Sequence, residues 1–395
     1  MSRPLRDVVV ADPSLPADLA RALAGTGPAV RVVPSAVAGS VPSPTSVPDE
    51  VAVAVATSGS TGEPRTVLLG AAALHASAQA THARLSGPGR WLLALPVDHV
   101  AGLQVLVRST LAGTTPVTLP PGPFTAAGFA VATARLDRSA PRYTSLVPTQ
   151  LGRVLDDPAA RDALVTFDAV LVGGAATPTA LLERARDAGA RVVTTYGMTE
   201  TCGGCVYDGR PLDGVRVRLS DEGRILLAGD VLATGYAQRP DLDAAAFVTF
   251  DNVPHLRTSD LGRLDGDVLT VLGRADDVLV TGGVNVAPAA VEDVLAALPS
   301  VAHALVVGVP DDEWGQCVTA LVVPRAGLAA PTLDELRAAV LATLGPAHAP
   351  RALVVVDGLP LRGPGKPDRA AATSIATAAR QDPRPQPTSP IRSHT

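Results

Sequence analysis

Lysine occurs only once in this sequence, at residue 366 within the stretch LRGPGKPDR. Lys366 is the single lysine among 33 Lys+Arg residues. Chance under a composition bias toward Gly, Pro, Ala and Arg is one explanation. A dedicated role is the other, because a compact ammonium on a flexible stem enters a space that a planar guanidinium cannot enter without rearrangement. The remaining motifs of the chain must decide between the two.

A loop rich in glycine and hydroxyl side chains, TSGSTGEPR, directly follows the apolar run VAVAVA. Its candidate phosphate-binding residues are Thr57, Ser58, Gly59, Ser60, Thr61, Gly62 and Arg65. Backbone N–H groups and hydroxyls in such a loop can surround phosphate oxygens. The spacing is not that of a Walker A loop. A Ser/Gly-rich turn by itself is more often only a turn, so this interpretation needs support from other motifs.

Two further motifs place a carboxylate at the end of a β-like run. TTYGMTETCGG begins at residue 194, and its Glu200 could hold a magnesium ion that carries nucleotide phosphates. RTSDLGRLDGD begins at residue 257, and its Asp260 could accept hydrogen bonds from ribose hydroxyls. A lone carboxylate on a turn is usually solvated surface. Three such elements in one chain together predict a nucleotide site.

The three cysteines are Cys202, Cys205 and Cys317, and the first two form a Cys-Gly-Gly-Cys. A single pair of this kind can be redox-active. Zinc would need two further ligands, which no second pair or nearby histidine supplies. The alternative interpretation is that these small residues line a strand and turn near a pocket.

Composition excludes several classes of partner. Hydrophobic residues make up 47% of the chain and charged residues 18%, which is a globular composition. A net charge of -5 and 3% aromatic residues argue against nucleic acid as a partner. No apolar run approaches the roughly 18 residues of a membrane-spanning helix, and the first residues lack a signal-peptide core. We therefore expect a cytoplasmic protein, with a homodimer left open.

From residue 51, short β-rich runs alternate with Ala/Leu-rich helical stretches. The expected strands are 51–56, 91–96, 143–148, 168–174 and 191–197, and the expected helices are 72–85, 102–113 and 177–189. This alternation predicts a layered α/β domain whose strands are covered by helices on both sides. Loops at the strand ends should then carry the chemistry.

The pattern of residues changes beyond residue 210. Gly-punctuated β runs predict an antiparallel or barrel-like section that closes the large domain. After Arg274, a mixture of helices and strands predicts a compact α+β domain. The last stretch, QDPRPQPTSPIRSHT, is Pro-rich and polar, which is typical of disorder. The expected organisation is a domain of residues 1–274, a smaller domain of residues 275–378 and a tail of residues 379–395.

In order along the chain, six motifs resemble those of the adenylate-forming superfamily of acyl-CoA synthetases, nonribosomal adenylation domains and luciferases. They are TSGSTGEPR, LPVDHVAGL, LVGGAATP with YGMTE, RTSDLGR, GRADDVLVTGGVNVAP and GKPDR. The resemblance implies a two-step reaction. A substrate carboxylate attacks the α-phosphate of Mg-ATP to give an acyl-adenylate and pyrophosphate, and the thiol of coenzyme A then displaces AMP. ATP, Mg²⁺ and coenzyme A are thus implied as substrates and activating ion, with no tightly bound cofactor.

The resemblance also implies roles for single residues. Lys366 is the catalytic cation, acting on carboxylate and phosphate together, and Glu200, the magnesium ligand, and Thr199 lie in the same catalytic motif. ATP binding is assigned to the phosphate loop and to Gly174, Ala175, Tyr196, Gly197, Asp260 and Arg274. Asp276 is the hinge about which the small domain swings, although an exposed acidic pair with Asp277 is the plain alternative. In the second orientation the Gly282-Gly283 loop admits the pantetheine arm.

Two departures from the superfamily pattern affect the ATP motifs. The phosphate loop ends in Arg65 where lysine is usual, and a bidentate guanidinium should serve for the outer phosphates. The ribose motif has Ser259 where glycine is usual, which keeps the carboxylate of Asp260 but puts the local turn in doubt. The region before the phosphate loop is also shorter than usual for the superfamily.

The acid substrate is the least determined part of the sequence interpretation. His99 and Arg108 are nine residues apart, which on a helix brings them within roughly a quarter turn. Such a pair would suit a substrate with a second carboxylate. The segments LPVDHVAGLQVLVRS and TYGMTETCGGCVYDG resemble actinobacterial o-succinylbenzoate-CoA ligases of menaquinone biosynthesis. The implied substrate is 2-succinylbenzoate, in a pocket shaped by His99, Arg108, Gly203 and Gly204.

Three other functions remain open at this stage. Another acyl- or aryl-CoA ligase would share every ATP motif and differ only in the acyl pocket. An adenylation enzyme that loads a carrier protein would also share them, although no carrier module follows in this chain. A nucleotide-binding regulator without catalysis is disfavoured, because Glu200 and Lys366 are both retained.

Overall fold

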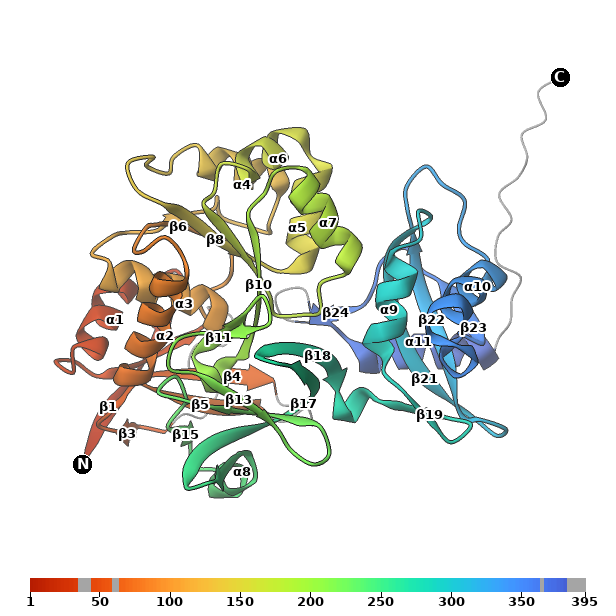
Figure 1. The fold of residues 1–395 in the computed structure, drawn as a ribbon. Helices are drawn as coiled ribbons and strands as arrows, with labels where there is room; N and C mark the ends of the chain where they lie inside the picture. The colour runs from red at the N-terminus through yellow and green to blue at the C-terminus, as the bar shows by residue number, and fades with distance from the viewer. Residues whose placement is uncertain (35–43, 59–63, 363–365, 382–395) are drawn as a thin grey trace. The chain divides into compact units, whose positions relative to one another are not determined.

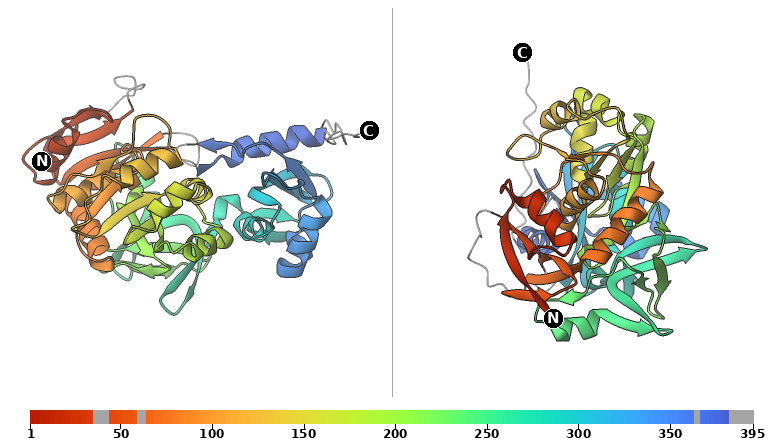
Figure 2. Two further views of the ribbon diagram at one scale, coloured as in Figure 1. Left: turned by 90° about the horizontal axis from the view of Figure 1, so that it is seen from above. Right: turned by 90° about the vertical axis from the view of Figure 1, so that its left-hand side faces the viewer.

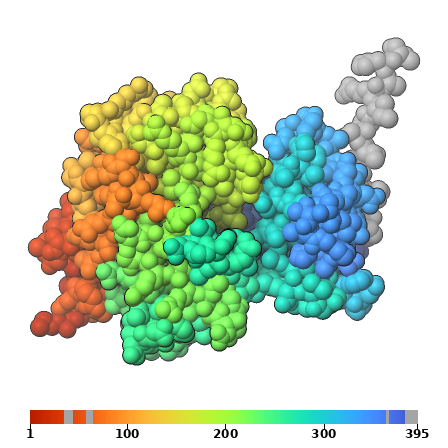
Figure 3. Space-filling model, viewed as in Figure 1, coloured from red at the N-terminus to blue at the C-terminus, as the bar shows by residue number. Residues whose placement is uncertain are grey.

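The computed structural model describes residues 1–34, 44–58, 64–362 and 366–381. The chain divides into two compact units between Ala275 and Asp276. Figure 1 shows the first unit in red to teal and the second in teal to blue, and Figure 3 shows the surface of both from the same side. Each unit has its own hydrophobic clusters, so each is described by itself.

A six-stranded sheet forms one layer of the first unit, in the order β15-β5-β4-β2-β1-β3. Its strands are β1 (Ser2–Val9), β2 (Ala29–Val33), β3 (Ser46–Pro48), β4 (Val51–Ser58), β5 (Pro64–Gly70) and β15 (Gly235–Tyr236). The predicted strand 51–56 is therefore present as β4. β4 and β5 form a hairpin in which Ser58 pairs with Pro64 across the phosphate loop.

A seven-stranded sheet forms the second layer, in the order β12-β11-β10-β9-β8-β6-β7. Its strands are β6 (Arg90–Leu93), β7 (Val117–Thr118), β8 (Arg142–Leu146), β9 (Ala169–Val172), β10 (Val192–Met198), β11 (Gly203–Tyr207) and β12 (Arg210–Pro211). β6 to β10 are parallel, and β11 turns back antiparallel to β10. The predicted strands 91–96, 143–148, 168–174 and 191–197 overlap β6, β8, β9 and β10 of this sheet.

Helices cover both sheets. They are α1 (Leu15–Leu23), α2 (Ala71–Arg84), α3 (Val100–Leu111), α4 (Ala126–Thr133), α5 (Pro148–Asp156), α6 (Pro158–Leu164) and α7 (Thr179–Asp187). Alternate residues of β9 point to opposite faces of its sheet. Val170 and Val172 pack with α4 to α7 on one face, whereas Ala169 and Leu171 pack with α2 and α3 on the other. α2 and α3 also contribute to the cluster on the six-stranded sheet. They thus form the layer between the two sheets, as Figure 1 shows.

A third, antiparallel sheet completes the first unit, in the order β13-β14-β17-β16, with β18 on β17. Its elements are β13 (Arg216–Leu219), β14 (Arg224–Ala228), α8 (Pro240–Ala246), β16 (Phe247–Phe250), β17 (Val253–Asp265) and β18 (Val268–Arg274). The layered α/β domain with a β-rich closing section is therefore confirmed. The N-terminal elements β1, α1 and β2 were not predicted from the sequence.

The second unit is a sheet covered on both faces. It contains β19 (Leu279–Thr281), β20 (Val284–Val286), α9 (Pro288–Ala296), β21 (Val301–Asp311), β22 (Gly315–Pro324), α10 (Leu333–Leu344), β23 (Ala352–Val355), β24 (Leu361–Arg362), β25 (Lys366–Pro367) and α11 (Arg369–Gln381). Val306 and Val318 pack with α9 and α10, whereas Leu305 and Leu321 pack with α11. The predicted α+β architecture of the small domain is confirmed.

The helix α11, dark blue in Figure 2, includes three residues that the sequence analysis assigned to the tail. Ala372 and Ala376 bury one face of α11 on the sheet. Near its end, Arg380 binds the carboxylate of Asp311 at 2.8 Å. The helix therefore runs through residue 381, where a tail from residue 379 was expected. Residues 382–395 lie outside the described part of the chain.

Candidate active site

Glu200 lies in the short 3-10 helix Thr199–Thr201 that follows β10, and a tyrosine holds its carboxylate. The hydroxyl of Tyr236, from β15, donates to Oε1 of Glu200 at 2.8 Å. Burial raises the pKa of Tyr236, and the carboxylate of Glu200 raises it further, while the positive charge of Arg65 opposes both. Tyr236 therefore joins the predicted magnesium ligand to the cation that ends the phosphate loop.

The phosphate loop itself is described only at its two ends. Gly59, Ser60, Thr61 and Gly62 lie outside the described residues. At the near end, Oγ1 of Thr57 donates to the carbonyl of Arg65 at 3.4 Å, and the backbone of Ser58 pairs with that of Pro64. The β4–β5 hairpin thus brings the two ends of the loop together.

A second hydroxyl–carboxylate pair joins two predicted nucleotide motifs. The hydroxyl of Tyr196, from β10, donates to Oδ2 of Asp260 in β17 at 2.8 Å. Burial raises the pKa of Tyr196, and the charge of Asp260 raises it further. Arg274 faces Asp260 in the β17–β18 register. The strand β17 continues through Ser259 without a break, so the departure there leaves the backbone of the ribose motif extended.

The glycines of the nucleotide motifs lie where parallel strands end. Gly174 and Ala175 follow β9, and Gly197 lies near the end of β10, so the sheet brings them to one edge. Gly174 has a φ of 81°, which favours glycine. A Cβ at Gly197 would come within 2.1 Å of the carbonyl oxygen of Gly203, so any side chain there would force β10 and β11 apart.

The structure does not bring His99 and Arg108 together. His99 is the N-cap residue of α3, whereas Arg108 lies in its last turn. The helix rises about 1.5 Å per residue, so nine residues separate them by about 13 Å along the axis. The rotation of the helix brings the two residues toward one side of it, but the rise keeps them apart. The two residues therefore do not form the close pair that the rotation alone indicates.

Arg108 is instead buried between α3 and the second sheet. Its side chain lies over the ring of Trp91, 5.1 Å from the centroid, and its Nη2 donates to the hydroxyl of Tyr207 at 3.4 Å. Gly203 and Gly204 are closely packed, because a Cβ on Gly203 would lie 3.3 Å from Cγ of Gln104. The glycines permit α3 and β10 to approach β11.

The remaining predicted residues belong to the second unit. Lys366 is exposed and pairs with Arg362 across the β24–β25 hairpin. Asp276 begins this unit, in a 3-10 helix with Asp277. Asp277 forms an ion pair with Arg369 at 3.0 Å, so the alternative of a plain exposed acidic pair does not describe it.

Gly282 and Gly283 form the turn between β19 and β20. Their φ values are 56° and 77°, which a tight two-residue hairpin turn requires. A Cβ on Gly282 would come within 2.9 Å of the Trp314 ring, and its N–H donates to the Trp314 carbonyl at 2.9 Å. The turn is therefore fixed against the body of its unit.

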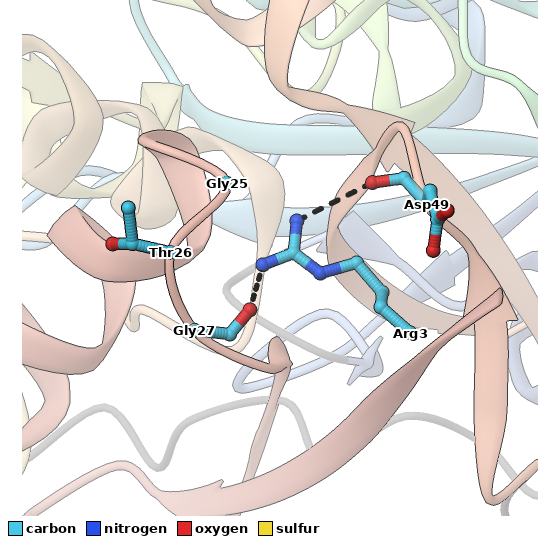
Figure 4. Close-up of a pocket in the computed structure, with 5 residues that line it drawn as sticks. All are labelled: Arg3, Gly25, Thr26, Gly27 and Asp49. Atoms are coloured by element: carbon cyan, nitrogen blue, oxygen red, sulfur yellow. Dashed lines mark hydrogen bonds between the residues drawn. The ribbon is translucent and has the colours of Figure 1, made fainter. Parts of the chain in front are cut away.

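A cavity of about 460 Å³ near the N-terminus is not lined by the predicted nucleotide residues. It is lined by Arg3, Gly25, Thr26, Gly27 and Asp49 (Figure 4). Arg3 donates to the carbonyls of Gly27 and Asp49 there, and to those of Ala22 and Val51. These bonds occupy its guanidinium within the fold, so the cavity offers no free cation.

Sequence analysis missed Tyr236, Tyr207 and Trp91. Tyrosine and tryptophan are rare here, with four and two residues in the chain. Their rarity was one signal, and Tyr207 also lies in the quoted segment TYGMTETCGGCVYDG. In the parts of the chain that the structure describes, no group of three or more His, Cys, Asp or Glu side chains could form an all-protein metal site.

Two family models match the sequence. A model of the AMP-binding enzymes matches residues 5–237. A model of the C-terminal domain of AMP-binding enzymes matches residues 290–366. The two matches fall within the first and second units respectively.

Several individual proteins are similar over most of the chain. A probable 2-succinylbenzoate–CoA ligase of Mycobacterium tuberculosis is 50% identical over 368 residues, which are 90% of this chain and 93% of that protein. The 2-succinylbenzoate–CoA ligase of Bacillus subtilis is 31% identical over 305 residues, which are 71% and 60% of the two chains.

Solved structures give the same picture. The o-succinylbenzoate CoA synthetase of Bacillus subtilis in complex with its acyl-adenylate intermediate superposes with a TM-score of 0.70 at 26% identity, over 93% of this chain and 82% of that one. ATP-bound MatB from Rhodopseudomonas palustris gives a TM-score of 0.75 at 25% identity, over 94% and 79%.

Proposed function

The chain belongs to the AMP-binding enzyme family, and we propose on this basis that it is the ligase that joins 2-succinylbenzoate to coenzyme A, a step of menaquinone biosynthesis. The observation that carries this proposal is 50% identity to a probable 2-succinylbenzoate–CoA ligase over nearly the full length of both chains. The ATP motifs, which depart from the superfamily pattern at Arg65 and Ser259, support the ligase chemistry.

The proposed reaction has two steps. The succinyl carboxylate attacks the α-phosphate of ATP, which forms the mixed anhydride and releases pyrophosphate. The thiol of coenzyme A then attacks the acyl carbon, and AMP leaves with the electron pair of the broken C–O bond. Both steps concentrate negative charge, so positioned cations should stabilise their transition states.

The first unit offers groups for the nucleotide. The carboxylate of Glu200, fixed on one oxygen by Tyr236, would help to hold a Mg²⁺ ion. Such an ion neutralises phosphate charge when it is bound. Arg65 would bind the outer phosphates, and Asp260, fixed by Tyr196, would accept from the ribose hydroxyls. Thr199, buried beside Glu200, would orient this motif.

We propose that the second unit supplies Lys366 as the cation of the adenylation step, and that Asp276 is the hinge. The Gly282-Gly283 turn would admit the pantetheine arm in the thioester step. The exposure of Lys366 on a short hairpin supports its availability to a substrate.

Location and assembly are also proposals. No helix within the described ranges is both long and apolar enough to cross a membrane. We propose that the enzyme acts in the cytoplasm, where ATP and coenzyme A are available, and that it forms a homodimer. Light scattering on the purified protein would test the dimer, and a monomeric mass would reject it.

The test of function is pyrophosphate release from Mg-ATP, measured with and without coenzyme A. The panel is 2-succinylbenzoate, substituted benzoates and straight-chain fatty acids. Selective turnover of 2-succinylbenzoate, with the CoA thioester as product, is the expected result. Selective turnover of a fatty acid would keep the ligase chemistry and reject the substrate. Absence of turnover with every acid would reject both.

A further inference from the structure

The two-stranded hairpin that carries Lys366 is too small to fix its own position. Within the described residues, β24 and β25 pair at Leu361–Pro367 and at Arg362–Lys366. An isolated hairpin of two strands is at best marginally stable in water. Contacts outside the hairpin must therefore set the direction in which it presents Lys366.

The two residues that directly follow the hairpin provide such contacts. The N–H of Asp368 donates to the carbonyl of Pro360 at 2.9 Å, which closes the base of the hairpin. Oδ1 of Asp368 accepts from the N–H of Ala371 at 3.1 Å, as the side chain of an N-cap residue does. Arg369 then begins α11. The hairpin therefore continues into the helix without a free linker.

The guanidinium of Arg369 contacts three other segments of the second unit. Its Nη1 and Nη2 donate to the two carboxylate oxygens of Glu292, in α9, at 2.7 and 3.1 Å. Its Nε lies 3.0 Å from Oδ2 of Asp277, the residue directly after the proposed hinge. Nη1 also donates to the carbonyl of Val306, in β21, at 2.7 Å. One side chain thus joins the start of α11 to the hinge segment, to α9 and to β21.

These contacts fix a direction more than they add stability. The side chains of Arg369, Glu292 and Asp277 are 26%, 16% and 29% exposed, and ion pairs that water reaches contribute little to stability. A bidentate pair, however, sets the orientation of the guanidinium. Oε1 of Glu292 also accepts from the N–H of Val306 at 2.8 Å, so the acceptor is itself held on β21. A displacement of Arg369 would break several directional contacts at once.

We propose that Arg369 is a positioning residue for the adenylation step, because it holds the Lys366 hairpin in a fixed position relative to Asp277. This inference rests on the proposed function, in which Lys366 supplies the cation. The ion pair anchors the chain from Asp277 onward, which confines the pivot to Asp276 before it. A rotation about that pivot then moves the lysine together with the rest of its unit. Without the guanidinium, the hairpin loses its connection to the hinge segment.

The test measures the two half-reactions separately in the full-length enzyme. Adenylation is followed as single-turnover pyrophosphate release from Mg-ATP with 2-succinylbenzoate. Thioester formation is followed from synthetic 2-succinylbenzoyl-adenylate and coenzyme A. Arg369→Gln should slow adenylation on the order of 100-fold, the cost of a displacement of about 1 Å. It should leave thioester formation nearly unchanged, because Lys366 is not assigned to that step.

Three further variants separate charge, direction and location. Arg369→Lys keeps the charge without the planar fork, so it should recover only part of the adenylation rate. Asp277→Asn weakens one charge-assisted contact and should slow adenylation by about 10-fold. Arg380→Gln is the matched control, because it removes another ion pair of α11, with Asp311, and should leave both half-reactions unchanged.

A double-mutant cycle distinguishes positioning from a purely structural role. If Arg369 acts through Lys366, Arg369→Gln should not slow adenylation further in the Lys366→Ala enzyme. Full additivity, or an equal loss in both half-reactions, would overturn the inference. If Arg369→Gln fails to fold, Asp277→Asn decides by the same two criteria. Wild-type enzyme that releases no pyrophosphate would instead reject the proposed function, and this inference with it.

Discussion

The hydroxyl of Tyr236 links two parts of the nucleotide machinery in the first unit, the Glu200 carboxylate and Arg65 of the phosphate loop. It donates to Glu200, interacts with Arg65, and extends from a ring that packs in the core at 6% exposure. Because the ring is anchored, the hydroxyl fixes the direction of the Glu200 carboxylate. Tyr236 lies outside both motifs in the sequence, but in the folded chain it positions Glu200 and Arg65 relative to each other.

Removal of this hydroxyl should weaken the use of magnesium and ATP. A hydrogen bond to a charged group contributes about 1.5–3 kcal/mol. We therefore expect Tyr236→Phe to raise the Mg²⁺ concentration for half-maximal pyrophosphate release by about 10-fold or more, with the KM for the acid unchanged. Tyr143→Phe is the matched control, because it removes another buried hydroxyl, which binds Ser86 and Gly87. Equal Mg²⁺ curves for both variants would contradict the positioning role.

Lys366 is the second residue whose role can be tested singly. Loss of a positioned cation costs about 3 kcal/mol or more of transition-state stabilisation. We expect Lys366→Ala to lower the rate of adenylate formation by at least about 100-fold and to leave ATP binding nearly intact, as measured by pyrophosphate release and calorimetry. Lys366→Arg should fail as well, because a planar guanidinium does not fit where one compact charge must reach two anions. Normal pyrophosphate release by either variant would reject the assignment.

Cys205 provides a test in alkaline solution. Burial raises the pKa of Cys205 to about 12, above the value near 8.5 of an exposed thiol. The thiol therefore stays neutral in the folded protein while the unfolded chain ionises. Its contribution to stability is fully present below about pH 8.5 and is lost as the pH rises toward 12.

The matching measurement is denaturant unfolding of wild type and Cys205→Ala at pH 7.5 and 9.5. From pH 7.5 to pH 9.5, the free energy of unfolding of the wild type should fall by about 1 kcal/mol more than that of Cys205→Ala. Ellman's reagent should not react with Cys205 before unfolding. Rapid reaction with the native enzyme would show an accessible thiol and would reopen the redox interpretation.

At the scale of elements, α3 depends on a glycine in its first turn. A Cβ at Gly102 would come within 2.1 Å of the Pro96 carbonyl oxygen. The loop before α3, which carries His99, can therefore fold back onto the helix only if residue 102 has no side chain. This close approach sets the direction of α3, which carries Arg108 in its last turn.

Two glycine substitutions should therefore change the free energy of unfolding in opposite directions. Gly102→Ala should lower the free energy of unfolding by more than about 1 kcal/mol, because the backbone must shift. Gly152→Ala, in α5 with open space around the new methyl group, should raise it by up to about 1 kcal/mol. Thermal denaturation of the two variants checks both signs, and stabilisation by Gly102→Ala would contradict the packing at α3.

Elements with strong alternation were predictable, and elements set by tertiary contacts were not. Each of the five strands predicted between residues 51 and 197 overlaps an observed strand. α11 was missed because it follows Pro367 and enters a Pro-rich end, while its stability comes from packing on β21. The partner of Arg108 was missed because Tyr207 belongs to β11, and only the folded chain places β11 beside α3. Local periodicity carries no information on such pairs.

At the scale of the whole molecule, the two units have separate cores. The cluster around Leu295 contains only residues from Leu279 onward, and the clusters of the first unit end before Ala275. Separate cores can unfold separately. The chain should therefore show two thermal transitions, one for each unit.

Leu295→Ala should lower the temperature at which the second unit unfolds. Leu295 is fully buried, and Leu→Ala in a core costs about 2–5 kcal/mol. The matched change in the first unit is Leu151→Ala, because Leu151 is equally buried there. It should lower only the temperature at which the first unit unfolds. Scanning calorimetry distinguishes the two. A single transition that both substitutions shift equally would show that the units unfold together.

The exposed hairpin position of Lys366 has a practical consequence for labelling. Because the chain has no other lysine, it presents one ε-amine, and that amine is the proposed catalytic group. An amine-reactive fluorophore, applied where the N-terminal amine is blocked, would attach one dye per molecule. Activity should fall in proportion to the dye bound. The absorbance of the bound dye would then give the fraction of enzyme that is inactivated. Protection by ATP with the acid would then report substrate occupancy at Lys366 directly.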